Sequence, residues 1–215
     1  MNRREVNTAL VAGAALAAMP ITAGTQGMKT LPAPRKEAGK PLMQALQARQ
    51  SIRKFSPRPL PSQVLSDLLW AAYGVNRASG DRTTPYWRHI MVIDVYAATA
   101  DGVWLYDPQQ HALRPHLETD IRAQTGLQDF VATAPLNLVY VAHGEKMKDI
   151  SPEERRLYGS VDAAFAGQNV YLYCASEGLA TVFRGAVDHE KLYKAMRLDN
   201  EQFVTFAQTV GSPQL

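Results

Sequence analysis

The chain has 215 residues, of which 46% are hydrophobic and 20% are charged, and its formal net charge is +3 at pH 7. This length and apolar content are sufficient for one domain with an ordinary core. The small net charge, and the lack of a basic run interleaved with aromatic residues, argue against a nucleic-acid partner.

The N-terminus has the pattern of an export signal. Arg3 and Arg4 precede an uncharged run, Ala9 to Met19, that is too short to cross a bilayer, and small residues follow it up to Ala23. The paired arginines and the alanine-rich run favour the twin-arginine route, whereas an ordinary Sec signal or an uncleaved anchor is the alternative. We expect residues 1–23 to be a twin-arginine signal peptide, and the mature protein to be periplasmic without stable membrane insertion after cleavage.

Cys174 is the only cysteine, so the chain cannot form an intramolecular disulfide. Many small exported proteins depend on disulfides, but the twin-arginine route carries proteins that have already folded in a reducing cytoplasm. Because Cys174 lies in an apolar stretch without a recognisable histidine and acid partner, we expect it to be a buried core residue.

Residues 24–40 are rich in glycine, proline and lysine, which predicts a linker or an extended arm, and residues 41–215 are expected to form a single domain. A helix should begin at Pro41 and end where the segment 49–55, Arg-Gln-Ser-Ile-Arg-Lys-Phe, runs into several prolines. Three cations and a hydroxyl at this helix end would suit the oxygens of a ligand phosphate. A solvated cationic helix end is the alternative, and composition alone favours it.

The remaining pattern alternates helices and strands. It predicts an α+β or mixed α/β fold with a mainly antiparallel sheet and helices on its faces. Ser62, Ser151 and Asp188 are expected N-caps, and Gly74 and Gly178 are expected helix ends. The predicted helices are Gln63–Tyr73, Asp120–Val131, one opening at Ser151, Val161–Glu177 and Glu190–Met196, and the predicted strands are His89–Tyr96, Val103–Tyr106, Ala112–Arg114, Leu136–Ala142, Leu179–Phe183 and Phe203–Val210.

The polar loop from Asn76 to Pro85 lies between a helix and a strand, a position that often carries binding residues. His111 and His116 fall in the expected hairpin without a partnering carboxylate motif, so we interpret them as surface histidines rather than metal ligands.

Three motifs together resemble the nitroreductase family of FMN-dependent oxidoreductases. They are the segment 49–55, the Arg-Thr-Thr-Pro sequence at 82–85, and Gln168-Asn169 followed by Ser-Glu-Gly-Leu at 176–179. Their order and spacing match from about Pro41 to Pro213. Within the family, the second motif and the compact length look most like the branch that includes azoline dehydrogenases of peptide-modifying systems.

The resemblance implies an intertwined homodimer of nitroreductase-like fold, with FMN bound at the subunit interface. Arg49 and Ser51 would hold the FMN phosphate and ribityl chain, and Arg53 would lie near the pyrimidine edge of the flavin. Thr83 and its neighbours would approach the ring from one subunit, and the 176–178 turn from the other. The implied cofactor-binding residues are Arg49, Gln50, Ser51, Arg53, Arg82, Thr83, Thr84, Pro85, Ser176, Glu177, Gly178 and Arg184.

Two features depart from the family pattern. The chain lacks the basic C-terminal tail that helps to bind phosphate in relatives, and its middle loop lacks an asparagine that many relatives place against the flavin. Arg184 could substitute for the tail, with a surface or dimer-interface arginine as the equally supported alternative.

The implied reaction passes hydride through flavin N5 between a small-molecule electron donor and an acceptor such as a nitro compound or a quinone. This needs little acid–base machinery, because the flavin carries the chemistry. Tyr158, Tyr171 and Tyr173 are interpreted as packing residues with polar tips. The alternatives are a flavin-binding carrier without turnover and a dimeric scaffold that has lost FMN. Because NAD(P)H is not expected outside the cytoplasm, the physiological donor of an exported enzyme would be another reductant.

Overall fold

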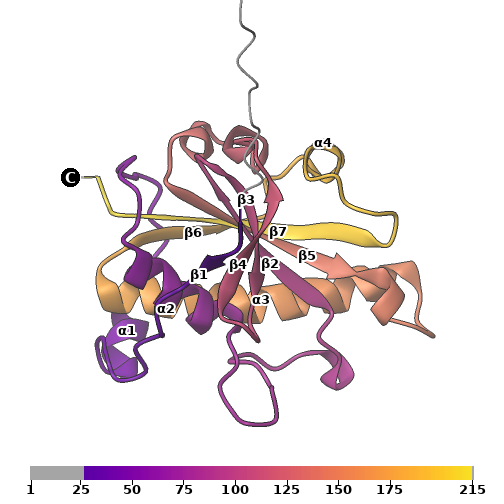
Figure 1. Cartoon of the computed structure of the whole chain (residues 1–215), viewed down its shortest axis with the longest axis horizontal. Coiled ribbons are helices and arrows are strands. Elements are labelled where there is room, and N and C mark those ends of the chain that lie inside the picture. Colours follow the sequence, from indigo (N-terminus) through magenta and orange to yellow (C-terminus); the bar gives the residue numbers. More distant parts are fainter. Residues whose placement is uncertain (1–26, 215) are drawn as a thin grey trace, which may run out of the picture.

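The computed structural model describes residues 27–214 (Figure 1). The expected signal peptide, residues 1–23, lies outside the described residues. The described chain forms a seven-stranded sheet in the order β1-β4-β3-β2-β5-β7-β6, and every neighbouring pair of strands is antiparallel. The predicted α+β class with a mainly antiparallel sheet is confirmed.

Helices α1, α2 and α3 gather on one side of this sheet, while α4 lies on the other (Figure 1). The strands are β1 (Lys29–Thr30), β2 (Ile93–Thr99), β3 (Gly102–Asp107), β4 (Ala112–Leu117), β5 (Leu136–His143), β6 (Ala180–Arg184) and β7 (Gln202–Gly211). The helices are α1 (Leu42–Ala48), α2 (Ser62–Tyr73), α3 (Pro152–Glu177) and α4 (His189–Ala195), with short 3-10 turns η1 (Trp87–His89), η2 (Arg122–Gln124), η3 (Asp129–Ala132) and η4 (Gly144–Lys146).

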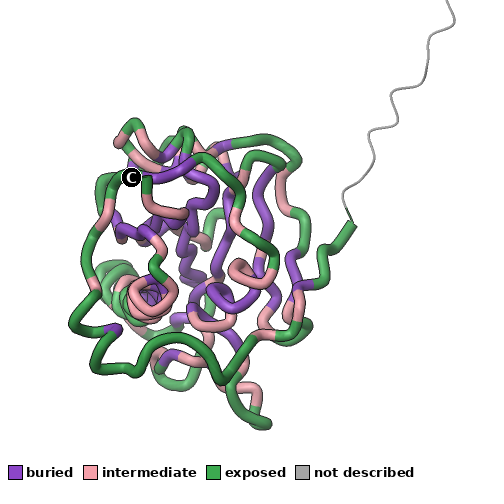
Figure 2. Tube along the Cα trace, turned by 90° about the vertical axis from the view of Figure 1, so that its left-hand side faces the viewer, coloured by how far each residue is buried: buried purple, intermediate pink, exposed green. Residues whose placement is uncertain are grey.

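Strand β5 is the most enclosed part of the sheet, since all its residues are buried. Its alternate side chains face opposite ways, so that Tyr140 packs in the cluster under α2 and α3, whereas Val141 packs in the cluster under α4. Figure 2 shows the buried segments in the interior and the exposed ones at the periphery. The apolar run in the sequence is nearly unbroken because helices cover both faces of the sheet at this strand.

Helix α3 is one continuous helix of 26 residues, not the two successive helices that we predicted. It begins in a capping box, in which Ser151 and Glu154 bond each other's backbone amides, and it ends at Gly178 with φ of 71°. Both predicted ends are confirmed. The boundary expected near Val161 is absent because no proline or cap interrupts this stretch.

Two glycines let α3 lie close against the sheet. A Cβ atom on Gly159 would stand 2.8 Å from Ala142 Cβ, and one on Gly167 would stand 2.5 Å from the Phe183 ring. These separations are shorter than side-chain atoms tolerate, so each glycine is required by the close approach of helix and strand.

The segment 120–131 is not the amphipathic helix that we predicted, but the two 3-10 turns η2 and η3. Between them, Gly126 lies against the Arg184 guanidinium, where a Cβ atom would be 1.9 Å from Nη1. Tertiary packing around this buried arginine overrides the local helical pattern.

Two smaller predictions are corrected. The strand expected from His89 starts at Ile93, because residues 87–89 form η1, in which Arg88 and His89 have positive φ. Ser62 is the first residue of α2 rather than its cap, and Pro61 at the cap position provides no side-chain hydrogen bond. By contrast, the Asp188 side chain caps α4 as expected.

Residues 27–40 form an ordered arm that runs along the helices. Lys29 and Thr30 pair with β4, Leu31 is buried, and Arg35 is held by the buried Asp67 carboxylate of α2. Lys40 N donates to Ser176 Oγ at the end of α3. The arm thus connects the edge of the sheet to the C-terminal end of the long helix.

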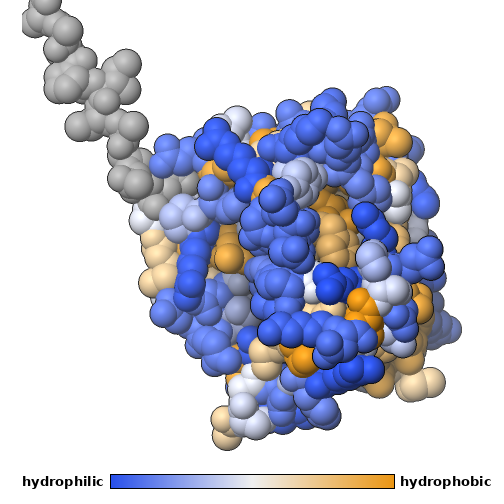
Figure 3. Space-filling view, turned by 90° about the vertical axis from the view of Figure 1, so that its right-hand side faces the viewer, coloured by the Kyte–Doolittle hydropathy of each residue, from blue (hydrophilic) through white to orange (hydrophobic). Residues whose placement is uncertain are grey.

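Within residues 27–214, no helix has the length and apolar character needed to cross a membrane. The face shown in Figure 3 is mainly hydrophilic, with smaller hydrophobic areas set between polar side chains.

Candidate functional site

The predicted motifs converge on the C-terminal half of α3. The segment 49–55 contacts it through Tyr171, the 82–85 loop through Asn169, and the 176–178 turn is its own end. Ile52 N also donates to Thr181 O, which aligns the first motif with β6. Segments distant in the sequence therefore meet on one helix.

Arg49 and Ser51 are arranged around the Tyr171 side chain. The Arg49 guanidinium lies 5.2 Å from the centre of the Tyr171 ring, and Ser51 Oγ lies 2.7 Å from its hydroxyl oxygen. That oxygen also accepts a 2.9 Å hydrogen bond from Phe183 N. This geometry allows Tyr171 to donate to Ser51, which leaves the Ser51 hydrogen available for an incoming anion.

The other polar residues of this motif are open to solvent. Gln50 and Arg53 are exposed, whereas Arg49 is half-buried. In the part of the chain that the structure describes, neither Arg49 nor Arg53 forms an ion pair with a carboxylate. The segment thus presents cationic groups without internal counter-ions, which suits a bound anion.

A hollow of about 400 Å³ lies between the arm, α1, α2 and α3. It has the size of a small-molecule pocket and combines apolar walls with a few charged groups. Its lining residues are Arg35, Lys36, Ala38, Lys40, Leu42, Ala45, Asp67, Trp70, Ala71, Thr83, Asn169, Leu172, Tyr173, Ser176 and Glu177.

Three predicted site residues line this hollow, namely Thr83, Ser176 and Glu177. Thr83 Oγ1 is buried and has no hydrogen-bond partner within the described chain, so it can serve a ligand. Ser176 Oγ accepts from Lys40 N at 2.6 Å, and the Glu177 carboxylate lies 3.6 Å from Arg35 Nη2. The arm therefore already engages both side chains at the end of the helix.

Gly178 offers open space rather than a free donor. No atom lies within 4 Å of the position that a Cβ would occupy, so a ligand can approach closely there. Its N–H, however, is bonded to Cys174 O in the helix cap. Any ligand contact at Gly178 in this conformation would use its carbonyl oxygen or its exposed Cα face.

Arg82 faces the interior instead of the hollow. Its guanidinium lies over the Tyr73 ring at 5.5 Å and donates to Gly80 O, and its buried Nε has no partner within residues 27–214. Thr84 is buried as well, while Pro85 is exposed. Of the 82–85 motif, only Thr83 reaches the hollow.

Arg184 is neither a surface nor an interface arginine, which corrects that prediction. It is 3% exposed and donates to Thr209 Oγ1, Thr125 O and Asn137 Oδ1. Burial lowers the pKa of Arg184 to about 10. Because its donors are engaged inside the subunit, Arg184 is not placed to bind a cofactor phosphate.

The nitroreductase family model matches residues 46–212, which include all the motifs described above. The chain belongs to the nitroreductase family. The crystal structure of a candidate nitroreductase from Ralstonia eutropha JMP134 is 42% identical, covers 88% of this chain and 91% of that chain, and superposes with a TM-score of 0.84. A candidate nitroreductase from Methanocaldococcus jannaschii is 29% identical over 160 residues, which are 70% of this chain and 81% of the relative.

The NADPH:FMN oxidoreductase of Vibrio harveyi, solved in complex with NAD+, is more distant. It is 21% identical, covers 81% of this chain and 69% of that chain, and has a TM-score of 0.59, so this similarity shows the fold alone. Membership of the nitroreductase family supports a flavin-dependent oxidoreductase at the level of the family.

The residues present in this nitroreductase fit a flavin mononucleotide. Arg49 and Arg53 lack carboxylate partners in the described chain, and the Ser51 hydroxyl contacts the same tyrosine as Arg49. Thr83 has a buried hydroxyl without a partner in residues 27–214. The first three groups can donate to the oxygens of a phosphate, and the fourth can bond a polar ring edge.

Two supporting features of this site were not predicted. Tyr171 is a positioning residue for Arg49 and Ser51 and not only a packing residue, and Lys36 and Lys40 of the arm line the hollow. The basic composition of residues 24–40 was the available signal, but it does not show where the arm folds back.

The histidines and the cysteine do not contribute to this site. His111 bonds Ser66 Oγ and the Tyr106 hydroxyl, and His116 Nε2 lies 2.6 Å from Met196 O, so both are half-buried structural residues rather than the surface histidines that we predicted. Cys174 is fully buried in the core as predicted, and burial raises its pKa well above the usual range.

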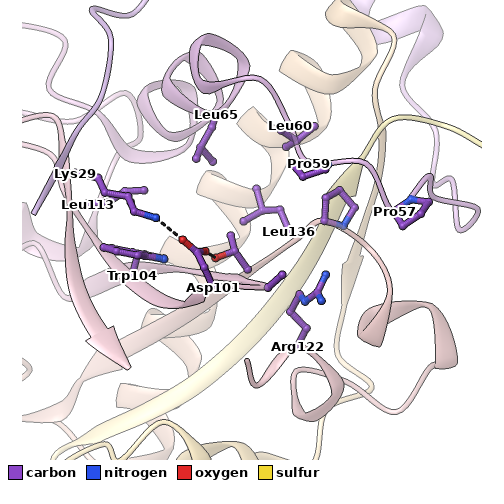
Figure 4. Close-up of a pocket in the computed structure, with 13 residues that line it drawn as sticks. Lys29, Pro57, Pro59, Leu60, Leu65, Asp101, Trp104, Leu113, Arg122 and Leu136 are labelled. Atoms are coloured by element: carbon purple, nitrogen blue, oxygen red, sulfur yellow. Dashed lines mark hydrogen bonds and ion pairs between the residues drawn. The ribbon is translucent and has the colours of Figure 1, made fainter. Parts of the chain in front are cut away.

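A second hollow of about 400 Å³ lies between β1, the start of α2 and the sheet (Figure 4). Its walls are mostly apolar, and Lys29 at its rim points to Asp101 and forms an ion pair with it. Arg122 is bonded to Asp120. Since its charged groups are paired and none of the predicted site residues lines it, this hollow is a weaker candidate than the one beside α3.

Asp162 provides a test of how α3 holds the loop that carries Thr83. Its buried carboxylate accepts a 3.0 Å bond from Trp87 N, and burial raises its pKa to about 6. Since the unfolded value is about 3.9, the native state binds the proton more tightly, and the free energy of unfolding should fall as pH rises from about 4 to about 6.

Asp162→Asn, which keeps an acceptor for Trp87 N, should remove this decline and stabilise the fold at pH 7 by up to about 3 kcal/mol. Urea denaturation of both proteins between pH 4 and 7 measures the effect. An unchanged pH slope in the variant would show that Asp162 is solvated and ordinary.

Proposed function

We propose that this nitroreductase-family protein is an FMN-dependent oxidoreductase that transfers hydride, through flavin N5, to or from a small organic substrate such as a nitro compound or a quinone. The observation that carries the proposal is the placement of Arg49 and Ser51 around Tyr171. Arg53 lies two residues further along the same segment and is exposed, so the segment presents two arginines and a hydroxyl to solvent. FMN supplies the hydride chemistry when bound.

Each residue has a task that its position permits. Arg49 and Ser51 would bind the phosphate and ribityl chain, held in place by the Tyr171 ring and hydroxyl. Arg53 would lie near the pyrimidine edge of the flavin, where a cation favours the negative charge that reduction brings. The Thr83 hydroxyl would bind a polar atom of the ring or of the substrate.

Arg49→Ala combined with Arg53→Ala should abolish retention of FMN without unfolding the protein. Each charge-assisted contact contributes about 1.5–3 kcal/mol, so the dissociation constant of added FMN should rise on the order of 100-fold or more. Quenching of flavin fluorescence measures the constant, and circular dichroism checks the fold.

The matched control is Lys148→Ala combined with Lys191→Ala, which removes two exposed positive charges elsewhere. It should bind FMN as the unmodified protein does. If the Arg49 and Arg53 variant instead unfolds, or binds FMN normally, these arginines are structural or merely solvated, and the proposed site is wrong.

We also propose a homodimer, on the basis of an apolar stripe along α3. Leu157, Val161 and Phe165 follow one another at intervals of four residues and are exposed, as are Met43 and Leu46 of α1. A helix that exposes large apolar side chains at this spacing is suited to pack against another surface. A second copy of the chain would cover the stripe and bring two FMN sites to the interface.

Val161→Glu together with Phe165→Glu should therefore convert the dimer to a monomer, since association would bury these charges unpaired. Analytical ultracentrifugation measures the mass. Leu127→Glu, which changes an exposed apolar residue outside the stripe, is the control and should leave the mass unchanged. If the unmodified protein is monomeric at micromolar concentration, the proposed homodimer is wrong.

Finally, we propose export to the periplasm by the twin-arginine route. The proposal rests on Arg3-Arg4 and the uncharged run from Ala9 to Met19. Arg3→Lys combined with Arg4→Lys should retain the protein in the cytoplasm, as measured by cell fractionation. Unchanged export would indicate a Sec signal, and cytoplasmic location of the unmodified chain would exclude export.

A further inference from the structure

We infer that the arm makes the hollow beside α3 a receptor for a small planar organic anion, which is the class of electron acceptor or donor that this enzyme takes. The inference rests on the proposed flavin function for the role of that ligand, but the binding itself depends only on residues of this chain.

Two sets of contacts hold the arm at the hollow, one at Arg35 and the other at Lys40. Arg35 N donates to Asp67 Oδ1 at 2.8 Å and Arg35 Nε donates to Asp67 Oδ2 at 2.7 Å, while Arg35 Nη2 lies 3.6 Å from Glu177. Asp67 is buried, so its charge requires this partner. At the other end, Lys40 N donates to Ser176 Oγ, and Gly39 has a φ of 82° as the chain turns against the helix end.

Because Arg35 neutralises the acidic residues of the hollow, the lysines of the arm are left without a carboxylate partner there. Asp67 and Glu177 are its two acidic lining residues, and both face Arg35. Lys36 and Lys40 also line it, and neither forms an ion pair in the part of the chain described here. Glu37, the acid between them, does not line the hollow.

The remaining groups suit a flat ligand rather than a bare ion. The Trp70 indole lines the wall, 5.8 Å from Lys36 Nζ, with Leu42 and Leu172 among the apolar neighbours. The unpartnered Thr83 hydroxyl lies on the same lining. Lysines and a hydroxyl would bind the charged and polar ends, and the indole would lie against the ring.

The location connects the hollow to the reaction. It ends at Ser176 and Glu177, directly before the open space at Gly178. The phosphate-binding candidates Arg49, Ser51 and Arg53 do not line it. The cofactor phosphate and the organic anion would therefore be recognised by different cations, the first by the 49–53 segment and the second by the arm.

The test compares two probes of the same shape, 4-nitrobenzoate and the neutral 4-nitrobenzamide, binding to the oxidised protein without reductant. Isothermal titration calorimetry should show tighter binding of the carboxylate. Lys36→Gln combined with Lys40→Gln should weaken 4-nitrobenzoate about tenfold or more and leave 4-nitrobenzamide within about twofold. Lys148→Gln with Lys191→Gln is the matched control, which should change neither constant.

The FMN content of each sample, read from its absorbance, separates this inference from the proposed function. Equal affinity for the two probes, or equal weakening of both by the arm variant, overturns anion recognition even if FMN is bound. Loss of FMN from the arm variant would also overturn it, because the arm would then bind the cofactor. A protein that binds no FMN but keeps the charge preference supports the receptor and refutes the flavin function.

Discussion

The close packing of α3 against the sheet is the constraint on which the candidate site depends. Gly159 and Gly167 remove the side chains that would hold the helix away from β5 and β6. The helix therefore packs directly on the strands. Its C-terminal half contacts three separate segments, which are the 49–55 motif, the 82–85 loop and the arm. A helix displaced from the sheet would separate them.

The distribution of charge shows which cations serve the fold and which can serve a ligand. Arg35 neutralises the buried Asp67, and Arg184 is enclosed by neutral acceptors from three elements. Such buried groups are costly to disturb. Arg49, Arg53, Lys36 and Lys40 are different, since none has a carboxylate partner within residues 27–214. Arg49 lies against Tyr171 of α3, and Lys36 and Lys40 line the hollow that includes Ser176 and Glu177. An anionic cofactor and an anionic substrate would each find cations there that the fold does not need.

Much of the architecture could be predicted from local patterns. The serine cap at Ser151, the glycine after Glu177 and the apolar run of β5 each have a local physical cause, and each was predicted. The 120–131 segment was predicted wrongly, because Arg184, far along the chain, decides its conformation. The sequence also grouped Arg82 with Thr83, although adjacent side chains of an irregular loop can point to opposite sides, as these do.

The motif residues of the site were predictable through their resemblance to a family, whereas the arm was not. Proline, glycine and lysine at 24–40 indicate a chain without regular structure. Its course is fixed by distant partners, namely β4, the buried carboxylate of Asp67 and Ser176. The tyrosine that supports Arg49 and Ser51 was likewise hidden, because a hydrogen bond across 120 residues leaves no local pattern.

The most direct test of the central claim is the visible absorption spectrum of the protein purified without residues 1–23, together with the mass of any ligand that it releases. We expect a yellow protein that carries FMN at about one per subunit. A colourless protein that also fails to bind added FMN would refute the flavin site, and Arg49 and Arg53 would then require another ligand.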